Sequence, residues 1–428
     1  MKILVVGGGG REHAIVHSLK KSPRVTQLYC APGNGGIAAE AICVPIKATD
    51  ISALAEFSVK ENFDLVMVAP DDPLALGLVD ELEKRGVRAF GPHANAAVIE
   101  SSKAFSKALM RKYGIPTAEY EIFTDISAAL EYMEEKGAPI VVKADGLALG
   151  KGVVVAQTVK EAQDAVRSMM EDKKFGDSGS TVVIEECMTG PEVTVLAFTD
   201  GKTIVPMLSS QDHKRVFDND EGPNTGGMGA FCPSPNYSPE IADFCMNKIF
   251  RPTIDAMAAE NRPFKGVIYF GLMLTPNGPK VVEYNARFGD PEAQPILSML
   301  ETDLLDIFEA VVDEKLADLD IKWKPGASCC VVMASGGYPV KHSTGYEING
   351  LSDVPSDVFV YHAGTQLEDG KYITSGGRVL GVTAVSGDLA SASKLAYEGV
   401  SKISFTDEHH RTDIGNKQRH GFTDTAGI

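Results

Sequence analysis

The chain has 428 residues, which is enough for about three domains with well-buried cores. Its 41 basic and 58 acidic side chains give a net charge of −17, and such a surface repels a phosphate backbone, which argues against nucleic acid as a partner. No apolar run approaches the 18 residues of a membrane span and the seven cysteines include no C-x-x-C pair, so we expect a cytoplasmic protein without membrane contact.

The first hundred residues alternate short apolar runs with helical patterns. Strands are expected at Ile3–Val6, Gln27–Ala31, Leu65–Ala69 and Val87–Phe90, and helices at Arg11–Lys20, Ile51–Asn62 and Leu74–Arg85. This alternation predicts a parallel sheet with helices on both faces. Glycine- and proline-rich loops follow three of the strands, and in an open α/β sheet such loops line one crevice at the carboxyl ends of the strands.

The loop after the first strand, G-G-G-G-R-E at 7–12, raises the question of a dinucleotide site. That site would need glycine where Glu12 stands, and a carboxylate after the second strand, where Cys30-Ala31-Pro32 offers none. The pattern therefore argues against NAD or FAD. The amides at the helix start can still hold one phosphate with Arg11 nearby, and a tight turn that needs only glycine geometry is the alternative.

Residues 139–156 place two β-type runs around a glycine-rich loop and predict a hairpin. A Walker loop is excluded because Gly146 and Gly150 are one residue too close and because a strand, not a helix, follows. With Lys143 and Lys151, a mobile hairpin here is suited to covering a triphosphate. The alternative is a surface hairpin whose lysines are solvated.

Three further segments carry candidate chemistry. The strand Thr181–Cys187 ends where backbone groups could meet an adenine, with Glu192 a few residues on for ribose hydroxyls. S-Q-D-H-K-R at 210–215 leads into the glycine-rich loop 222–229, an arrangement that suits an anionic substrate. A third unit begins near 326, with strands expected at Ser328–Ala334, Val358–His362 and Arg378–Val385 and a helix at Asp388–Ile403.

The sharpest pattern is V-V-E-Y-N-A-R at 281–287. Residues i, i+2 and i+4 of a strand share a face, so Glu283, Asn285 and Arg287 are expected to point the same way. Two hard oxygen ligands beside a guanidinium predict a divalent cation bridged to phosphate. The polar outer face of an edge strand is the alternative.

Taken together, the motifs resemble those of the ATP-grasp ligases and, more narrowly, of the phosphoribosylamine–glycine ligase (GAR synthetase) family. The resemblance runs from residue 1 to about 415 and rests on this series: G-G-R-E-H at 9–13, P-G-N at 32–34, E-S-S-K-A-F at 100–105, K-A-D-G-L-A-L-G-K-G-V at 143–153, S-Q-D-H-K-R at 210–215, G-P-N-T-G-G-M-G at 222–229, R-F-G-D-P-E at 287–292 and R-T-D-I-G at 411–415. It implies an α/β protein (α+β ATP-grasp). Its parts are an N-terminal parallel α/β domain at 1–102, an ATP-grasp core at 103–120 and 190–325, a lid at 121–189 and a small C-terminal domain at 326–428.

The resemblance also implies roles for individual residues. The ATP phosphates would be held by Lys103, Lys143, Gly146, Gly150, Lys151 and Gly152, the adenine by Glu185, Glu186, Cys187 and Met188, and the ribose by Glu192. The phosphoribosyl group would meet Gly9, Gly10, Arg11, Glu12, Pro32, Gly33 and Asn34. Glu283 and Asn285 would bind Mg²⁺ or Mn²⁺, and Asp212, Lys214 and Arg287 would handle glycine and the transferring phosphate.

The implied reaction joins glycine to 5-phosphoribosylamine with ATP, through glycyl phosphate, in de novo purine synthesis by a cytoplasmic monomer. Small departures from the family pattern are Gly8 where Asn is usual, Ala69, Phe270, Ala286, and no metal carboxylate at 271–273. Another ATP-grasp carboxylate–amine ligase is the nearest rival, against which the 9–13 and 210–215 motifs speak. A nucleotide sensor without turnover would have a degraded metal strand, and Glu283, Asn285 and Arg287 are intact.

Overall fold

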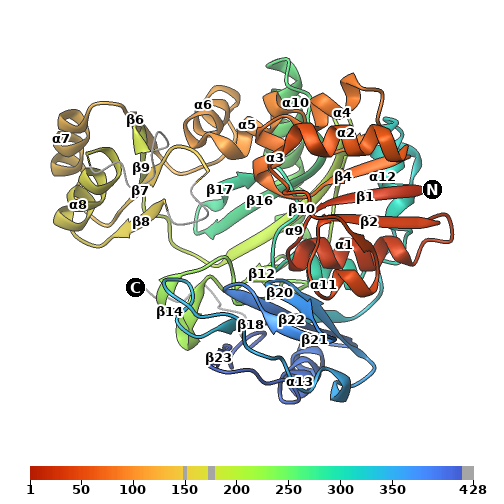
Figure 1. Cartoon of the computed structure of the whole chain (residues 1–428). Helices are drawn as coiled ribbons and strands as arrows, with labels where there is room; N and C mark the ends of the chain where they lie inside the picture. The colour runs from red at the N-terminus through yellow and green to blue at the C-terminus, as the bar shows by residue number, and fades with distance from the viewer. Residues whose placement is uncertain (148–151, 172–178, 417–428) are drawn as a thin grey trace.

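The computed structural model describes residues 1–147, 152–171 and 179–416. Figure 1 shows a body made of the N-terminal and central regions, a lid that projects to one side, and a C-terminal region packed below. Within the described ranges, no helix is long and apolar enough to cross a bilayer.

The N-terminal region is a parallel sheet in the order β3-β2-β1-β4-β5 with helices around it, as the alternating pattern predicts. Its elements are β1 (Lys2–Gly7), α1 (Gly10–Lys20), β2 (Gln27–Pro32), β3 (Ile42–Cys43), α2 (Ile51–Glu61), β4 (Leu65–Val68), α3 (Asp71–Ala75), α4 (Leu78–Lys84), β5 (Ala89–Phe90) and α5 (Ala94–Ser101). The single helix expected at Leu74–Arg85 is wrong, because Gly77 adopts a left-handed φ of 83° and separates α3 from α4. The two-residue strand β3 has no sequence pattern long enough to predict it.

The lid has a sheet and a core of its own. It contains β6 (Tyr120–Phe123), α7 (Ile126–Lys136), β7 (Ile140–Ala144), β8 (Val153–Ala156), α8 (Val159–Met170) and β9 (Val182–Glu186), with strand order β6-β9-β7-β8. The hairpin expected at 139–156 is confirmed, since Ile140 pairs antiparallel with Ala156 and Lys143 with Val153. Asp125 and Thr158 cap the two helices, whose apolar faces cover the sheet.

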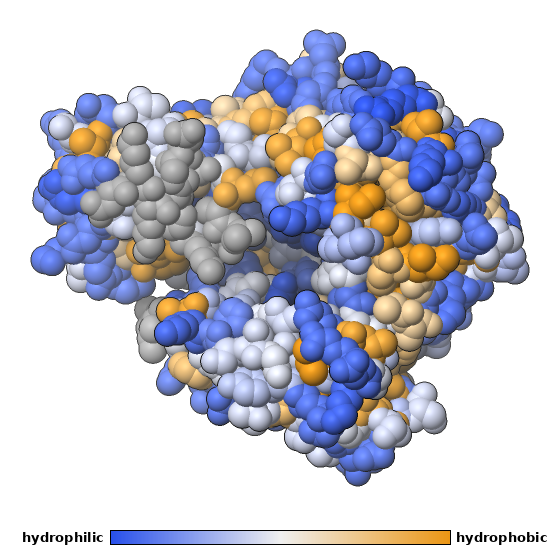
Figure 2. Space-filling model, viewed as in Figure 1, coloured by the Kyte–Doolittle hydropathy of each residue, from blue (hydrophilic) through white to orange (hydrophobic). Residues whose placement is uncertain are grey.

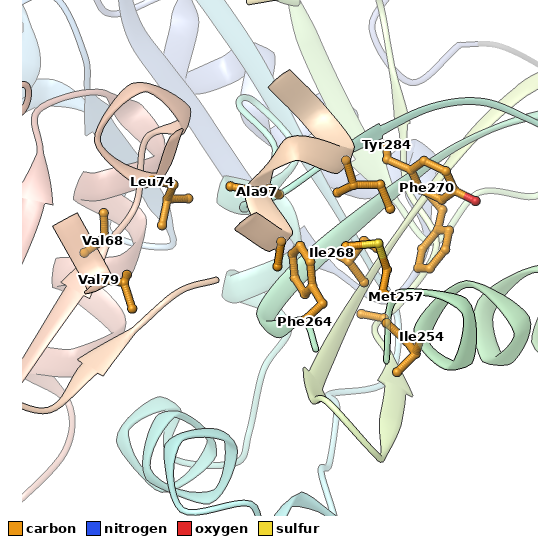
Figure 3. Packing of buried hydrophobic residues seen from close by; sticks show 14 of the residues in the cluster. Val68, Leu74, Val79, Ala97, Ile254, Met257, Phe264, Ile268, Phe270 and Tyr284 are labelled. Atoms are coloured by element: carbon orange, nitrogen blue, oxygen red, sulfur yellow. The ribbon is translucent and has the colours of Figure 1, made fainter. Parts of the chain in front are cut away.

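The central region is built on an antiparallel sheet in the order β11-β10-β16-β17. Its elements are α6 (Lys103–Tyr113), β10 (Glu192–Asp200), β11 (Ile204–Pro206), α9 (Pro239–Cys245), α10 (Arg251–Ala259), β16 (Lys265–Thr275), β17 (Gly278–Asn285), α11 (Ala293–Ser298) and α12 (Leu304–Val312). One apolar cluster joins this region to the N-terminal one: Leu74 and Val79 belong to the same buried group as Phe264 and Phe270 (Figure 3). This shared core fixes the N-terminal loops relative to β17.

The third sheet, in the order β12-β15-β18-β22-β19 with β23 beside β18, crosses the expected boundary near residue 326. Its strands are β12 (Gln211–Asp212), β15 (Gly229–Cys232), β18 (Ala327–Ser335), β19 (Val358–His362), β22 (Arg378–Ser386) and β23 (Glu408–His409). The sheet is covered by α13 (Leu389–Val400). It is flanked by two hairpins, formed by β13 (Arg215–Phe217) with β14 (Glu221–Asn224) and by β20 (Thr365–Glu368) with β21 (Lys371–Thr374). Because β15 pairs with β18, the C-terminal region shares a sheet with the strand that carries Asp212. All seven cysteines are free thiols.

Candidate active site

The carboxyl end of β17 carries the predicted metal ligands. Glu283 lies opposite Gly271 of β16, where a Cβ atom would come within 3.1 Å of the Glu283 Cγ, so the glycine leaves room for this side chain. Arg287 Nη2 donates to Asn285 Oδ1 at 3.0 Å and pairs with Glu100 Oε1 at 2.9 Å. Asn285 and Arg287 therefore touch each other, but β17 ends at Asn285, so Arg287 lies beyond the strand and the expected common strand face does not include it. Glu100 is a partner that sequence reasoning missed.

Four cations surround Glu283. Burial alone would raise the pKa of this carboxyl, but Lys214, Lys143, Lys103 and Arg287 together lower it below its usual value. The Lys214 ammonium lies 3.7 Å from Glu283 Oε1 and 3.2 Å from Glu192 Oε2, and Glu192 is the main cause of its strongly raised pKa. Each of these cations also faces a carboxylate other than Glu283, so the cluster is mixed in charge, and its ammonium and guanidinium groups can bind a polyanion such as a triphosphate.

The oxygen ligands of Glu283 and Asn285 fit a hard divalent cation that binds together with the nucleotide. Among the described residues, no group of three or more His, Cys, Asp or Glu side chains could hold a metal by itself. Glu283 and Asn285 supply two oxygen donors, and Mg²⁺ or Mn²⁺ bound there would complete its coordination with water and phosphate oxygens. The four cations make binding of a bare metal ion unfavourable, so metal and nucleotide are expected to bind together.

The start of α6 is tied to the lid hairpin. Lys103 Nζ donates to the carbonyl of Gly146 at 2.9 Å, and Asp145 accepts from the Ala104 amide at 3.0 Å. Gly152 closes the other flank, since its carbonyl accepts from the Ala144 amide at 2.8 Å. Gly150 and Lys151, both predicted phosphate ligands, lie outside the described residues.

A buried cluster of two lysines and one carboxylate lies behind this hairpin. Lys143 Nζ and Lys107 Nζ each lie 3.0 Å from the same oxygen, Glu185 Oε2, and all three side chains are at least nine-tenths buried. Burial is the main reason why the pKa of Lys107 falls to about 8. The second oxygen, Glu185 Oε1, has no hydrogen-bond partner among the described residues. Lys107 was missed by the sequence reading, although it lies one helical turn after Lys103.

The remaining nucleotide-side residues line the edge between lid and central sheet. Glu186 pairs with Lys280 at 2.7 Å, and Cys187 and Met188 follow it as half-buried residues. Asp212 lies on β12 opposite Ala230 and contributes to the raised pKa of Lys214. Figure 2 shows a hydrophilic hollow between the upper body and the C-terminal region.

The opposite side of the site is formed by the loop between β1 and α1. The Gly9 amide donates to Glu12 Oε2 at 2.6 Å, and Arg11 Nε lies 2.7 Å from Glu12 Oε1. Arg11 also donates from Nη1 to the carbonyl of Phe288 at 3.1 Å. Glu12 therefore caps α1 and takes the first amide of the turn, so this amide is not open to a phosphate.

The loop after β2 packs against the first one. Asn34 Nδ2 donates to the carbonyls of Gly8 and His362, and Asn34 Oδ1 accepts from the amides of Gly36 and Ile37. A Cβ on Gly8 would lie 2.5 Å from the carbonyl oxygen of Gly33, so a larger residue at position 8 would require this loop to move. Pro32 and Gly33 precede Asn34 in this loop; Pro32 has no N–H group, and the Gly33 amide donates to the carbonyl of Gly7 at 3.0 Å.

The C-terminal region holds both loops in place. The His362 amide donates to His13 Nδ1 at 2.7 Å, while its carbonyl accepts from Asn34, so the backbone of one residue joins α1 to the loop after β2. Arg378 Nη1 donates to the carbonyls of Gly226 and Asp290 at 2.8 and 2.7 Å. These contacts could not be read from the sequence because their partners lie far apart along the chain.

Comparisons with known proteins cover almost the whole chain. Sequence models of phosphoribosylglycinamide synthetase match at 1–100 (N domain), 101–293 (ATP-grasp A domain) and 328–417 (C domain). Proteins named phosphoribosylamine–glycine ligase from Caldanaerobacter subterraneus and Vibrio parahaemolyticus are each 47% identical, over 97% of this chain and 99% and 98% of their own lengths.

Solved structures agree with these matches. The phosphoribosylamine–glycine ligase of Thermotoga maritima is 30% identical and superposes with a TM-score of 0.83, covering 96% of this chain and 100% of that one. A biotin carboxylase from Campylobacter jejuni, 14% identical with a TM-score of 0.74 over 96% of this chain and 93% of that one, shares the fold alone. The chain therefore belongs to the phosphoribosylglycinamide synthetase family of ATP-grasp ligases.

Proposed function

We propose that this chain joins glycine to 5-phosphoribosylamine and converts ATP to ADP and phosphate, as a step of purine synthesis. The observation that carries the proposal is the group of four cations around Glu283, placed across from the two loops at 9–12 and 32–34. A two-step ligation requires two separate sides of the site. We call the charged side that would activate glycine with ATP the donor side (Lys103, Lys143, Lys214, Glu283, Asn285 and Arg287), and we call the two loops at 9–12 and 32–34 the acceptor side.

In the first step the glycine carboxylate attacks the γ-phosphorus of ATP and gives glycyl phosphate and ADP. Lys103 and Lys143 would bind the ATP phosphates together with the hairpin glycines and Lys151, while Glu185–Met188 would meet the adenine and Glu192 its ribose. Asp212, Lys214 and Arg287 would orient glycine and neutralise charge on the transferring phosphoryl group. Glu192 is ion-paired to Lys214, so contact of Glu192 with the ATP ribose would release Lys214 for this role.

Glu283 and Asn285 would hold Mg²⁺ or Mn²⁺, and the metal would supply further neutralisation of phosphate charge. Either ion accepts this all-oxygen donor pair, and comparing the two in the assay below decides between them.

In the second step the amine of phosphoribosylamine attacks the acyl carbon and expels phosphate. The loops at 9–12 and 32–34 would position the acceptor, and exclusion of water would protect the acyl phosphate from hydrolysis. We also propose that the chain works in the cytoplasm, to which its free thiols are suited, and that it is a monomer whose site is completed by its own C-terminal region.

The direct test uses the purified chain with ATP, Mg²⁺ and glycine, with and without freshly made phosphoribosylamine. We expect ADP release that depends on the acceptor and a product with the mass of glycinamide ribonucleotide. ADP release that ignores the acceptor, or no release in its presence, would contradict the proposal.

A further inference from the structure

Asp290 lies between the donor side and the acceptor side. It follows Arg287 in the loop that leads from β17 to α11, and its side chain is 17% exposed. Gln294 Nε2 donates to Oδ1 at 2.8 Å, and Arg378 Nη2 lies 3.2 Å from Oδ2. Each oxygen keeps a second lone pair, so the carboxylate can accept further hydrogen bonds.

The carboxylate faces the turn between β1 and α1. A Cβ atom on Gly9 would lie 3.4 Å from Asp290 Oδ2, and one on Gly10 would lie 3.7 Å from Asp290 Oδ1. The Gly9 amide is already taken by Glu12. The turn therefore presents two carboxylates near Gly9, each paired with a guanidinium group, and the remaining lone pairs of Asp290 can accept hydrogen bonds from hydroxyl groups.

Arg378 holds this carboxylate from the C-terminal region. Its guanidinium binds the Asp290 side chain with one nitrogen and the carbonyls of Asp290 and Gly226 with the other. Burial alone would raise the pKa of Asp290, but Arg378 and Arg11 lower it overall, so the group stays ionised. An ionised carboxylate accepts hydrogen bonds and donates none, which fixes the kind of ligand group that it can meet.

We infer that Asp290 contacts the acceptor and accepts hydrogen bonds from its ribose hydroxyl groups, and that Arg378 is the positioning residue for this carboxylate. The inference rests on the proposed function and adds a basis for sugar selection. In this arrangement the ribose hydroxyl groups lie next to the turn at Gly9 and Gly10. The 5-phosphate is bound by hydrogen-bond donors that lie further from the two carboxylates.

The test compares sugars and variants in one cycle. Acceptors are made from ammonia and ribose 5-phosphate, 2-deoxyribose 5-phosphate or 3-deoxyribose 5-phosphate, and kcat/KM for the acceptor is measured at saturating ATP and glycine. A hydroxyl bonded to a charged partner contributes about a 10- to 100-fold preference. The wild-type chain should therefore prefer the ribosyl acceptor to at least one deoxy acceptor by that factor.

Asp290→Asn should lower kcat/KM for the ribosyl acceptor about 10- to 100-fold and bring the ratio between sugars close to one, with the KM for ATP unchanged. Asp290→Glu, which keeps the charge but moves it, should also lose the discrimination, and it serves if the Asn variant fails to fold. Arg378→Lys should raise the KM for the acceptor without changing the KM for ATP. Asp313→Asn, which removes a carboxylate paired with Arg88 on the outer surface, is the matched control and should behave as wild type.

Wild-type discrimination between the sugars that survives in both Asp290 variants would overturn the inference and leave the proposed function intact. A wild-type chain that does not discriminate between the sugars would overturn it in the same way. A wild-type chain that uses no acceptor at all would instead refute the proposed function, and the inference with it.

Discussion

The donor side and the acceptor side of the site are built on different principles. On the donor side, Glu283 and Lys214 keep about a third of their side chains exposed, and their interactions are charge pairs across a gap. On the acceptor side, Glu12 is buried and Asn34 has all its polar atoms in hydrogen bonds to the protein itself. The donor side chains are therefore available for a ligand, whereas these acceptor side chains shape the loops that a ligand meets.

The difference separates two kinds of functional residue. A substitution of Glu283 or Lys214 should change chemistry and leave folding nearly untouched, because partly exposed charges contribute little to stability. A substitution of a loop-forming residue on the acceptor side should weaken folding and acceptor binding together, because it leaves buried polar groups without partners.

Glu283→Gln should lower kcat about 100-fold or more, because the only charged metal ligand is replaced by a neutral one where phosphate charge must be neutralised. The midpoint of thermal unfolding should stay within a few degrees of the wild-type value, because the Glu283 side chain is partly exposed. Steady-state kinetics and calorimetry check the two parts. Turnover near the wild-type rate with an unchanged metal requirement would remove Glu283 from the metal site.

Asn34→Ala should reduce the free energy of unfolding by about 2 kcal/mol, because four backbone groups lose their side-chain partner. It should also raise the KM for phosphoribosylamine about tenfold and leave the KM for ATP near its wild-type value. Arg11→Ala should shift the same kinetic parameter. Denaturant unfolding and acceptor titrations measure these effects, and a change confined to the KM for ATP would place the two loops at the wrong ligand.

Lys107 tests the buried cluster behind the lid hairpin, in which it pairs with Glu185. Its pKa is lowered to about 8, below its ordinary value of 10.5, so the folded chain releases this proton before the unfolded chain does. Below pH 8 the buried lysine is charged and the full cost of burying that charge remains. Between pH 8 and pH 10.5 the folded chain loses this proton while the unfolded chain keeps it, so the free energy of unfolding should rise with pH, by at most about 1.4 kcal/mol per pH unit from this group.

The difference between wild type and Lys107→Met in denaturant unfolding from pH 7.5 to 10.5 isolates this rise. Lys112 lies on the same helix in an exposed pair with Glu260 that raises its pKa, so Lys112→Met is the control and should keep the rise. If the free energy of unfolding changes with pH in the same way for wild type and Lys107→Met, then burial does not lower the pKa of Lys107.

Much of the donor side could be predicted because its residues occur in local patterns. The alternation of Glu283 and Asn285 on β17, and the position of Lys143 in a hairpin, both follow from short-range spacing. The family resemblance supplied the order of the domains. The helix break at Gly77 could not be read from the sequence, because an isolated glycine within a helical pattern is often tolerated.

The acceptor side was harder to predict because it depends on contacts between distant segments. His13 and His362 are 349 positions apart, and Arg378 meets Asp290 across 88 positions. No local pattern marks Arg378 or His362, so the C-terminal region looked free of functional residues. The family resemblance implied a ligand contact for Asn34, and the structure shows its side chain bonded to backbone groups of its own loop, of Gly8 and of His362.

The separation of the two sides can be tested most directly by running the first step alone. With ATP, Mg²⁺ and glycine, hydroxylamine in place of the acceptor attacks glycyl phosphate and gives glycine hydroxamate and phosphate. We predict that Asn34→Ala forms the hydroxamate at close to the wild-type rate, whereas Glu283→Gln forms it about 100-fold more slowly. Equal losses in the two variants, or no hydroxamate from the wild-type chain, would contradict a donor side that works independently of the acceptor loops.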